Sequence, residues 1–361
     1  MKICYLSNTA MPSKVASAIQ IVKMCEAFSE LGNEVKLITT NVSKSKKNIF
    51  KYYNIKKKFK IEKIFFFQKF PLGIWYYLFS IISVRKAIKF KSDIFVTRNY
   101  FSCFLLTLLN KKVIMELHHD LIEESRIVRT IFFFHNFLNS KSIVRIIAIT
   151  NSIKYHYIKK YGLEEKKIIV LASGSSIKKN FCFNKNKKKL RIGYFGSVYR
   201  SRGFELIIKL ARIDKNNDYY IFGDLKKKIN FLRNNNSNKN LFWQNYIPYN
   251  DVPKYLQKMD ILILPYVSAI TKAGNVGNIT KFTSPLKLFD YLRVGRVILC
   301  SNFSVLKEIL TNNKNAIFIK NYKNPHSWKL EINKISNSKQ KQFIISRNNY
   351  ILGKKYSLYN R

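Results

Sequence analysis

Residues 2–39, KICYLSNTAMPSKVASAIQIVKMCEAFSELGNEVKLIT, contain the pattern that decides the fold. Lys2 to Leu6 is a short apolar run typical of a buried strand, and a polar loop follows it. Apolar residues then recur from Ile19 to Leu31 with the period of a helix, which Gly32 ends before a second apolar run at Glu34–Thr39. A strand, a loop, a helix and a strand in this order predict a right-handed βαβ unit in a parallel sheet.

The same alternation continues through the first half of the chain and starts again in the second half. Further apolar runs predict strands at 93–97, 113–117, 145–150, 168–171, 190–195, 219–222, 261–264 and 297–300. A polar, basic segment at Lys185–Lys189 is predicted to be a linker. We therefore expect two doubly wound α/β domains with parallel sheets, one at residues 1–175 and one at residues 190–335, followed by a helical segment at 336–361.

The composition excludes a chain that is disordered throughout and gives it a strong positive charge. Hydrophobic residues make up 47% of the 361 residues, and 66 Lys and Arg against 20 Asp and Glu give a formal net charge of +46. Such a field attracts nucleic acid, an anionic membrane face or phosphorylated substrates. A compositional bias of the whole chain explains the excess equally well, because the basic residues are spread along it.

The cysteines and the apolar runs indicate where the protein works. Five scattered cysteines without a C-x-x-C pair favour a reducing compartment over disulfide bonds or a zinc site. The apolar run at the N-terminus is too short for a signal peptide. The best candidate for a membrane span, Ile64 to Ile82, is interrupted by Gln68, Lys69 and Pro71, so we expect a buried or surface-lying helix there and a cytoplasmic protein.

The loop from Gly196 to Gly203 is the first candidate for a ligand site, because open α/β sheets bind ligands at the loops that follow their strands. Gly196 lets the backbone approach a ligand, and the helix that follows offers free N–H groups to an anion. The planar fork of Arg202 can hold two phosphate oxygens. Taken alone, the loop is equally well an ordinary turn with a solvated arginine.

The helix that follows Ser284 and Pro285 carries a stronger signal. Ser284 is a good N-cap, and Pro285 suits the first helical position. Lys287 lies in the first turn, where a cation opposes the helix dipole unless an anion lies beside it. Asp290 shares a face with Lys287 and can accept hydrogen bonds from ribose hydroxyls, although a local Lys–Asp pair on an exposed helix is the alternative. The residues expected to bind a diphosphate are Gly196, Ser197, Arg202, Ser284 and Lys287.

Two adjacent histidines, His118 and His119, follow a predicted strand of the first half. Either of them can transfer a proton or orient a sugar hydroxyl, and we expect them to be catalytic; a pair of surface histidines is the alternative. Zinc is not expected there, because adjacent side chains point apart and no further ligand is near in sequence. The chain has no Asp-x-Asp pair, so we expect no metal and no cofactor, with basic side chains neutralising a diphosphate instead.

Several segments in their order and spacing resemble the bacterial GT4-type (group 1) retaining glycosyltransferases over nearly the whole chain. The segments that carry the resemblance are Pro12–Ser17, Gly32–Val35, Ser92–Arg98, Glu116–His118, Tyr194–Ser197, Arg202–Gly203, Asp251–Leu256, Asp260–Tyr266 and Ser284–Leu292. The resemblance implies a GT-B fold, in which two facing Rossmann-like domains bind the acceptor and the nucleotide sugar respectively. It also implies that residues 336–361 pack back on the first domain.

The resemblance also implies individual roles. Arg202 matches the basic residue that contacts the donor diphosphate, and Lys287 matches the lysine of a Ser-Pro-x-Lys variant of the family. Asp290 matches the second acid of the Glu-x7-Glu motif, which binds the donor ribose. His118 matches a histidine near the transferred sugar. Pro12 and Ser13 lie on the acceptor side.

Four positions depart from the family pattern. Phe282 stands where the first acid of Glu-x7-Glu is expected, and Asp290 is shorter than glutamate. Ser197 replaces an arginine, and His119 replaces an aspartate of many members.

We therefore expect a transferase that moves a sugar from a nucleotide sugar to a glycan or lipid-linked acceptor in the synthesis of surface polysaccharide or lipopolysaccharide. Peripheral contact with the anionic inner face of the cell membrane would suit its charge. One alternative is a protein that binds nucleic acid or another anionic surface, but the sequence has no helix-turn-helix or interleaved aromatic–basic motif, so no specific nucleic acid is expected. The other alternative is a sugar-nucleotide epimerase with the same fold.

Overall fold

The computed structural model describes residues 1–41, 48–65, 71–183, 188–198, 202–223, 233–234, 237–267 and 280–361. It divides into two compact units, residues 1–172 and residues 173–361. Part of the predicted linker Lys185–Lys189 lies outside the described residues, so the linker stays a prediction.

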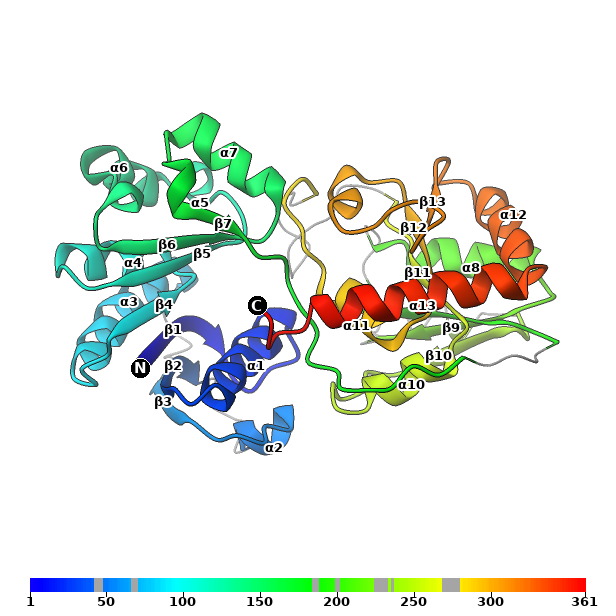
Figure 1. The fold of residues 1–361 in the computed structure, drawn as a ribbon, viewed down its shortest axis with the longest axis horizontal. Coiled ribbons are helices and arrows are strands. Elements are labelled where there is room, and N and C mark those ends of the chain that lie inside the picture. Colours follow the sequence, from blue (N-terminus) through cyan, green and yellow to red (C-terminus); the bar gives the residue numbers. More distant parts are fainter. Residues whose placement is uncertain are drawn as a thin grey trace. The chain divides into compact units, whose positions relative to one another are not determined.

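The first unit is built on a parallel sheet with the strand order β3-β2-β1-β4-β5-β6-β7 (Figure 1). Its strands are β1 Lys2–Ala10, β2 Glu34–Asn41, β3 Lys60–Phe65, β4 Ile94–Thr97, β5 Val113–Leu117, β6 Ile143–Ala148 and β7 Ile168–Val170. Its helices are α1 Ala16–Glu30, α2 Ile49–Tyr53, α3 Leu72–Ile88, α4 Tyr100–Leu108, α5 Leu121–Glu124, α6 Arg126–His135 and α7 Asn151–Tyr161.

The second unit repeats this plan with the strand order β10-β9-β8-β11-β12-β13, also all parallel. Its strands are β8 Arg191–Phe195, β9 Asp218–Phe222, β10 Leu241–Gln244, β11 Ile261–Leu264, β12 Val297–Ser301 and β13 Ile317–Ile319. Its longer helices are α8 Phe204–Ile213, α10 Val252–Lys258, α11 Leu286–Val294, α12 Pro325–Ser336 and α13 Lys339–Lys355. The prediction of two doubly wound α/β halves with parallel sheets is confirmed.

Local chemistry explains where the helices begin and end. The hydroxyl of Thr150 accepts a hydrogen bond from the N–H of Ile153 at 3.2 Å, so α7 begins there, and Gly162 ends it with a φ of 61°. Gly203 precedes α8 with a φ of 76°, and a β-carbon at this position would lie 1.5 Å from the carbonyl oxygen of Pro265. Glycine is therefore the residue that fits where the loop after β8 passes the end of β11.

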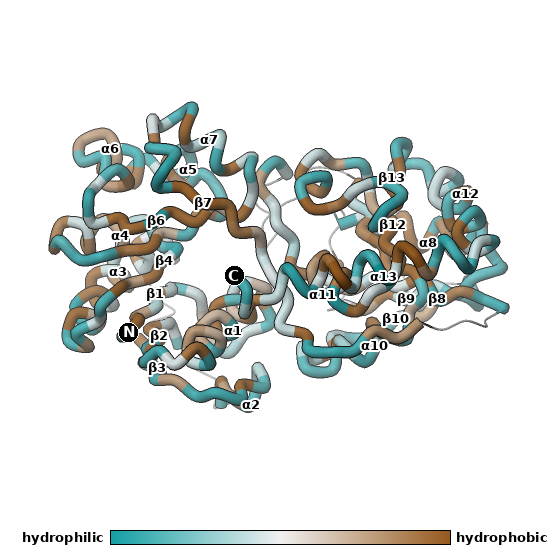
Figure 2. Tube along the Cα trace, in the orientation of Figure 1, coloured by the Kyte–Doolittle hydropathy of each residue, from teal (hydrophilic) through white to brown (hydrophobic). Residues whose placement is uncertain are grey.

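Each unit has its own apolar core, and the buried strands supply much of it (Figure 2 shows brown concentrated along the strands). Trp328 and Ile345 join α12 and α13 to the core of the second unit. Helix α13 lies along α11 in that unit, because Gly353 brings the two backbones into close approach. The packing of residues 336–361 on the first domain stays a prediction.

The structure differs from the sequence-based expectation mainly in the apolar segment Ile64–Ile82. Ile64 and Phe65 end the strand β3, so the expectation of a helix is wrong there, but it is confirmed from Leu72 onward, where the segment lies in α3. The alternation in β3 is weak because Lys60, Glu62 and Lys63 interrupt its apolar residues. Among the described residues, none of the helices combines the length and the apolar character that a membrane span needs.

Candidate functional site

The strand order of each sheet reverses at one position, which is where open α/β sheets bind ligands. In the second unit this position is β8, which lies between β9 and β11, and in the first unit it is β1, between β2 and β4. The loops that follow these strands are therefore the parts of the chain to inspect for a site.

The loop that follows β8 has no side chain at Gly196, so a ligand can approach its backbone closely there. The N–H of Gly196 donates a hydrogen bond to the carbonyl oxygen of Phe222 at 3.0 Å, and a β-carbon at Gly223 would lie 2.3 Å from the oxygen of Gly196. A β-carbon at Gly196 itself would lie 3.6 Å from the Nζ atom of Lys287. The backbone after β8 and the ammonium group of α11 therefore line one place.

Lys287 is packed among aromatic rings and a second cation. Its Nζ atom lies 4.3 Å from the ring centre of Tyr194 and 5.0 Å from that of Tyr266, and the Arg202 guanidinium lies 5.6 Å from the same Tyr266 ring. Burial, followed by the nearby charge of Arg202, lowers the pKa of Lys287 well below its usual value. Within the described part of the chain, no carboxylate forms an ion pair with Lys287. Two neighbouring cations at the end of a parallel sheet form a site suited to an anion.

Asp290 is buried one turn further along α11. The hydroxyl groups of Ser175 and Tyr249 donate hydrogen bonds to its Oδ1 atom at 2.6 and 3.2 Å. Burial raises the pKa of Asp290 to about 7, against the opposing effect of these two hydrogen bonds. No described residue donates a hydrogen bond to Oδ2, so this oxygen can still accept a ligand hydroxyl. The alternative of a Lys287–Asp290 pair on an exposed helix does not fit this arrangement.

Ser284 has a different place from the one expected. The helix α11 begins at Leu286 after an extended Pro285, and no side chain caps it. The Ser284 hydroxyl instead accepts a hydrogen bond from the N–H of Ser173 at 3.0 Å. The expectation that Ser284 is the N-cap is therefore wrong, because the extended Pro285 moves the start of the helix one residue on. A role for Ser284 and for the exposed Ser197 in binding a diphosphate stays a prediction.

In the first unit, four polar side chains join β1 to the ends of β4 and β5. Arg98 donates hydrogen bonds to the Tyr5 hydroxyl at 2.9 Å and to Oε1 of Glu116 at 2.8 Å. The same Glu116 oxygen lies 2.5 Å from Nε2 of His118. Burial opposes the charge of Arg98, but the Glu116 carboxylate and Tyr5 overcome it and raise the pKa of Arg98. Glu116 therefore fixes the position of His118 and is itself fixed by a buried cation.

The backbone next to His118 is also anchored. The hydroxyl groups of Tyr100 and Tyr157 donate hydrogen bonds to the carbonyl oxygen of His119 at 2.8 and 3.0 Å. The His119 ring lies 3.8 Å from the Glu124 carboxylate. The two predicted histidines thus differ: His118 is held by a buried carboxylate and His119 by an exposed one.

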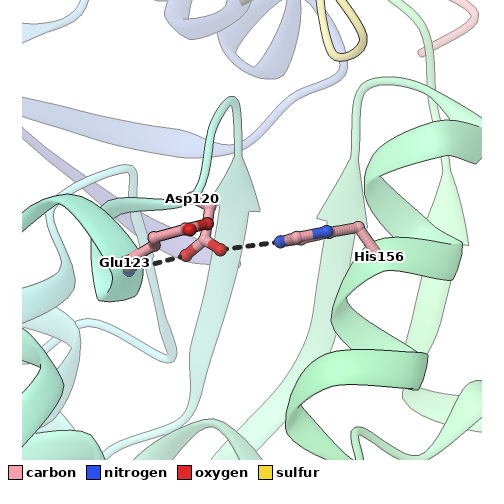
Figure 3. Close-up of side chains that lie close together, drawn as sticks. All are labelled: Asp120, Glu123 and His156. Atoms are coloured by element: carbon pink, nitrogen blue, oxygen red, sulfur yellow. Dashed lines mark hydrogen bonds and ion pairs between the residues drawn. The ribbon is translucent and has the colours of Figure 1, made fainter. Parts of the chain in front are cut away.

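A group with the donor types of a metal site lies next to this loop. Ligand atoms of Asp120, Glu123 and His156 lie within 4.8 Å of one another (Figure 3). The Asp120 carboxylate accepts hydrogen bonds from Tyr161 at 2.7 Å and from His156 at 2.6 Å, and the Lys160 ammonium lies 2.7 Å from Glu123. Burial opposes ionisation of Asp120, but the Tyr161 and His156 hydrogen bonds hold its pKa below the usual range. Lys160 already supplies a cation here, so the group anchors α7 to the loop.

On the expected acceptor side, Pro12 and Ser13 lie in the loop after β1. The Tyr53 hydroxyl accepts a hydrogen bond from the N–H of Ser13 at 2.7 Å and donates one to the Ser13 carbonyl oxygen at 2.8 Å. The Ser13 hydroxyl has no hydrogen-bond partner among the described residues. The loop is thus held by its backbone, and the Ser13 hydroxyl oxygen is buried within it.

Sequence reasoning found the charged members of the candidate site in the second unit and His118 in the first, but it assigned no role to the residues that support them. Lys287, Arg202 and Gly196 lie together as expected, and Asp290 lies on the same helix. The missed residues are Ser175, Tyr194, Tyr249, Tyr266, Arg98 and Glu116. For the two tyrosines, their position in the sequence is the available signal. Tyr194 lies in β8 and Tyr266 lies two residues after β11, and these two strands are neighbours where the sheet order reverses.

Two family models match the chain and together span residues 17–351. The model described as glycosyl transferases group 1 matches residues 175–351, and the model described as Glycosyltransferase Family 4 matches residues 17–177. No curated protein is similar to this chain in sequence.

Solved structures share the fold over nearly the full length of the chain. HepE from Anabaena, in complex with UDP, has a TM-score of 0.70 and 13% identity, with 100% of this chain and 97% of that chain covered. Sucrose-phosphate synthase from Thermosynechococcus elongatus has a TM-score of 0.73 and 11% identity, with 98% and 94% covered. The lipopolysaccharide outer core galactosyltransferase WaaB has a TM-score of 0.67 and 15% identity, with 99% and 97% covered.

We predict that Glu116→Gln lowers the free energy of unfolding by about 3 kcal/mol, because it leaves the Arg98 charge buried without a carboxylate. Urea denaturation measures the change. Glu34→Gln is the matched control, because Glu34 pairs with Lys60 in the same unit but at an exposed position, and it should cost less than about 0.5 kcal/mol. Equal effects of the two substitutions would show that the buried Arg98–Glu116 pair contributes no more to the free energy of unfolding than an exposed pair does.

Proposed function

The chain belongs to the group 1, family 4 glycosyltransferases, and we propose that it transfers a sugar from a nucleotide sugar to a lipid-linked glycan acceptor with retention of configuration at the anomeric carbon. Its two α/β units, each built on a sheet of parallel strands, have the GT-B fold of the solved relatives. Transfer by a glycosyltransferase is thus the premise, and the donor, the acceptor and the stereochemistry are the proposal.

The observation that carries the proposal is the pair of cations at the ends of β8 and β11. Lys287 and Arg202 lie against the same Tyr266 ring, beside the bare backbone of Gly196. A diphosphate between them would relieve the repulsion of the two charges and would return the lysine to its charged form. HepE was solved with UDP, which is a ligand of this chemical class.

The chemistry of transfer fits the same groups. When the bond between the anomeric carbon and the diphosphate oxygen breaks, negative charge grows on the departing nucleoside diphosphate. Lys287 and Arg202 would stabilise this charge in a partly buried place, where electrostatic interactions are strong. These cations would do the work of a metal ion, and the sequence has no Asp-x-Asp pair to hold one. The free oxygen of Asp290 would accept hydrogen bonds from the ribose hydroxyls of the donor.

The first unit would bind the acceptor and contact the transferred sugar. We assign His118 to the sugar, because Glu116 holds one ring nitrogen of His118 and thereby orients the ring. His119 has a secondary role in this proposal, since its ring pairs with Glu124. Pro12 and Ser13 would line the acceptor side, where the Ser13 hydroxyl has no described partner. Retention rests on the family resemblance.

We further propose that the enzyme works in the cytoplasm on acceptors of surface polysaccharide or lipopolysaccharide synthesis. The positive charge of the chain suits peripheral contact with the anionic inner face of the cell membrane. WaaB, named for the lipopolysaccharide outer core, has the same fold. This scheme requires no cofactor, because the nucleotide sugar is a substrate and the two cations take the place of a metal ion.

Calorimetric titration with UDP, GDP, ADP and CMP at moderate salt tests the donor site. We predict that one diphosphate binds selectively and that Asp290→Ala weakens it about tenfold or more, because the ribose loses hydrogen bonds to a charged group. Asp251→Ala is the matched control, since this acid lies outside the site at the start of α10, and it should leave binding unchanged.

Equal weak binding of all four nucleotides, unaffected by Asp290→Ala and fading with added salt, would mean that the net positive charge alone attracts them. The proposed donor site would then be wrong. Selective binding together with an isomerised sugar and no need for an acceptor would favour the epimerase alternative instead.

The pH dependence of binding follows from the pKa of about 7 for Asp290. Below pH 7 the carboxyl group is mostly protonated and is a poorer acceptor for ribose hydroxyls, so binding is predicted to strengthen as the pH rises. Between pH 6 and pH 8 the ionised fraction of Asp290 grows about tenfold. The ratio of wild-type affinity to Asp290→Asn affinity should therefore rise by about tenfold at most over this range. Titrations of both proteins measure this ratio, because the nucleotide phosphates titrate equally in both. A ratio that is constant with pH would contradict the role of Asp290.

A further inference from the structure

Helix α6 in the first unit is apolar on the side that faces solvent as well as on the side that faces the core. Val128 and Phe132 are buried. On the opposite side, Ile127, Phe133 and Phe134 are 55%, 72% and 82% exposed. We call the exposed residues of this helix the α6 outer face; they are Arg126, Ile127, Arg129, Thr130, Phe133, Phe134 and His135. Large side chains that are this exposed on one short helix usually mark a surface with a partner.

The apolar surface continues from α6 onto α4 and α3. In α4 the partly exposed Phe101 and Phe104 and the exposed Leu108 follow a helical spacing. The ring of Phe104 lies 5.3 Å from that of His135 in α6, and the ring of Phe101 lies 4.9 Å from that of Tyr77 in α3. The α6 outer face is therefore the edge of a larger apolar area formed by three helices.

The charges around this area are positive. Arg126 and Arg129 are exposed, and neither forms an ion pair with any described residue. Lys111 and Lys112, which follow α4, and Arg85 in α3 are exposed as well. The nearest acids along the chain, Glu123 and Glu124 of α5, pair with Lys160 and His119 respectively.

This combination identifies the kind of partner. Aromatic and aliphatic side chains with flanking arginines are the composition of helices that lie in the interface of an anionic bilayer. A second copy of the chain is disfavoured, because each copy carries a formal charge of +46 and the surrounding cations would repel. Nucleic acid would use the arginines and the rings but would leave Ile127 and Leu108 without an apolar contact.

We propose that the α6 outer face docks the protein on an anionic lipid bilayer. Phe133, Phe134 and Ile127 enter the headgroup region, and Arg126 and Arg129 contact lipid phosphates. The inference rests on the proposed function for one point, the lipid-linked acceptor, which explains why an enzyme of this family would be held at a membrane. The surface itself does not depend on the identity of the donor.

Sedimentation with vesicles tests this surface. The purified full-length chain is mixed with vesicles of phosphatidylcholine, with or without about one third phosphatidylglycerol, and the bound fraction is measured. The wild type is expected to bind the anionic vesicles, and Phe133→Ser/Phe134→Ser is expected to reduce the partition coefficient about tenfold or more. Arg126→Gln/Arg129→Gln should weaken binding to anionic vesicles and reduce its salt dependence.

The matched control is Ile344→Ser/Ile351→Ser, which likewise removes two exposed apolar residues, here from α13 of the second unit, and should leave vesicle binding unchanged. Equal binding by the wild type and the Phe133/Phe134 double variant would overturn the proposal. So would a wild-type dimer in light scattering that the double variant dissociates, because the face would then be covered by a second copy.

Nucleotide titration of the same variants separates this proposal from the proposed function. The Phe133/Phe134 double variant should bind nucleotide as the wild type does, which also shows that it is folded. If the wild type binds vesicles but binds no nucleotide selectively, the transferase proposal is wrong and the docking surface stands. If the wild type binds one nucleotide selectively but does not bind vesicles, the docking surface is wrong and the transferase proposal stands.

Discussion

The repulsion between Lys287 and Arg202 is the constraint on which the candidate donor site depends. Both cations lie against Tyr266, and Lys287 also lies over Tyr194, so the two charges are close together and partly removed from water. A fold with no ligand for this place would gain stability by replacing one of the cations with an apolar residue. Keeping both makes sense when an anion is bound for part of the working cycle.

The rest of the second unit is arranged around this place. Gly196 and Gly223 let the ends of β8 and β9 approach each other, and Gly203 lets the next loop pass Pro265. Asp290 lies one turn further along α11, where Ser175, from the segment that opens the second unit, and Tyr249 donate hydrogen bonds to its Oδ1 atom. Lys287 and Asp290 therefore lie on neighbouring turns of one helix, which is the arrangement that the proposed binding of a diphosphate and its ribose needs.

The sequence predicts the fold well because periodicity and glycine positions determine it locally. The βαβ pattern of residues 2–39 and its return after residue 190 predict both sheets, whereas β3, β10 and β13 were missed because they are short or broken by charged residues. The positions of Lys287 and Asp290 on one helix follow from their spacing. Their supports do not, because Tyr249 and Ser175 reach Asp290 across 41 and 115 positions of the chain, and such contacts depend on tertiary packing. Glu116 was part of a resembling motif, but its pairing with Arg98 needed the strand order β1-β4-β5.

The most direct test of the central claim compares how Lys287→Met changes the binding of a nucleoside diphosphate and of the corresponding nucleoside. The account predicts that the variant loses about tenfold or more in affinity for the diphosphate and little for the nucleoside, because a charged hydrogen bond to phosphate is removed. Lys281→Met, which removes the same charge from an exposed position before α11, should change neither. A Lys287→Met protein that binds the diphosphate as tightly as the wild type would contradict the account.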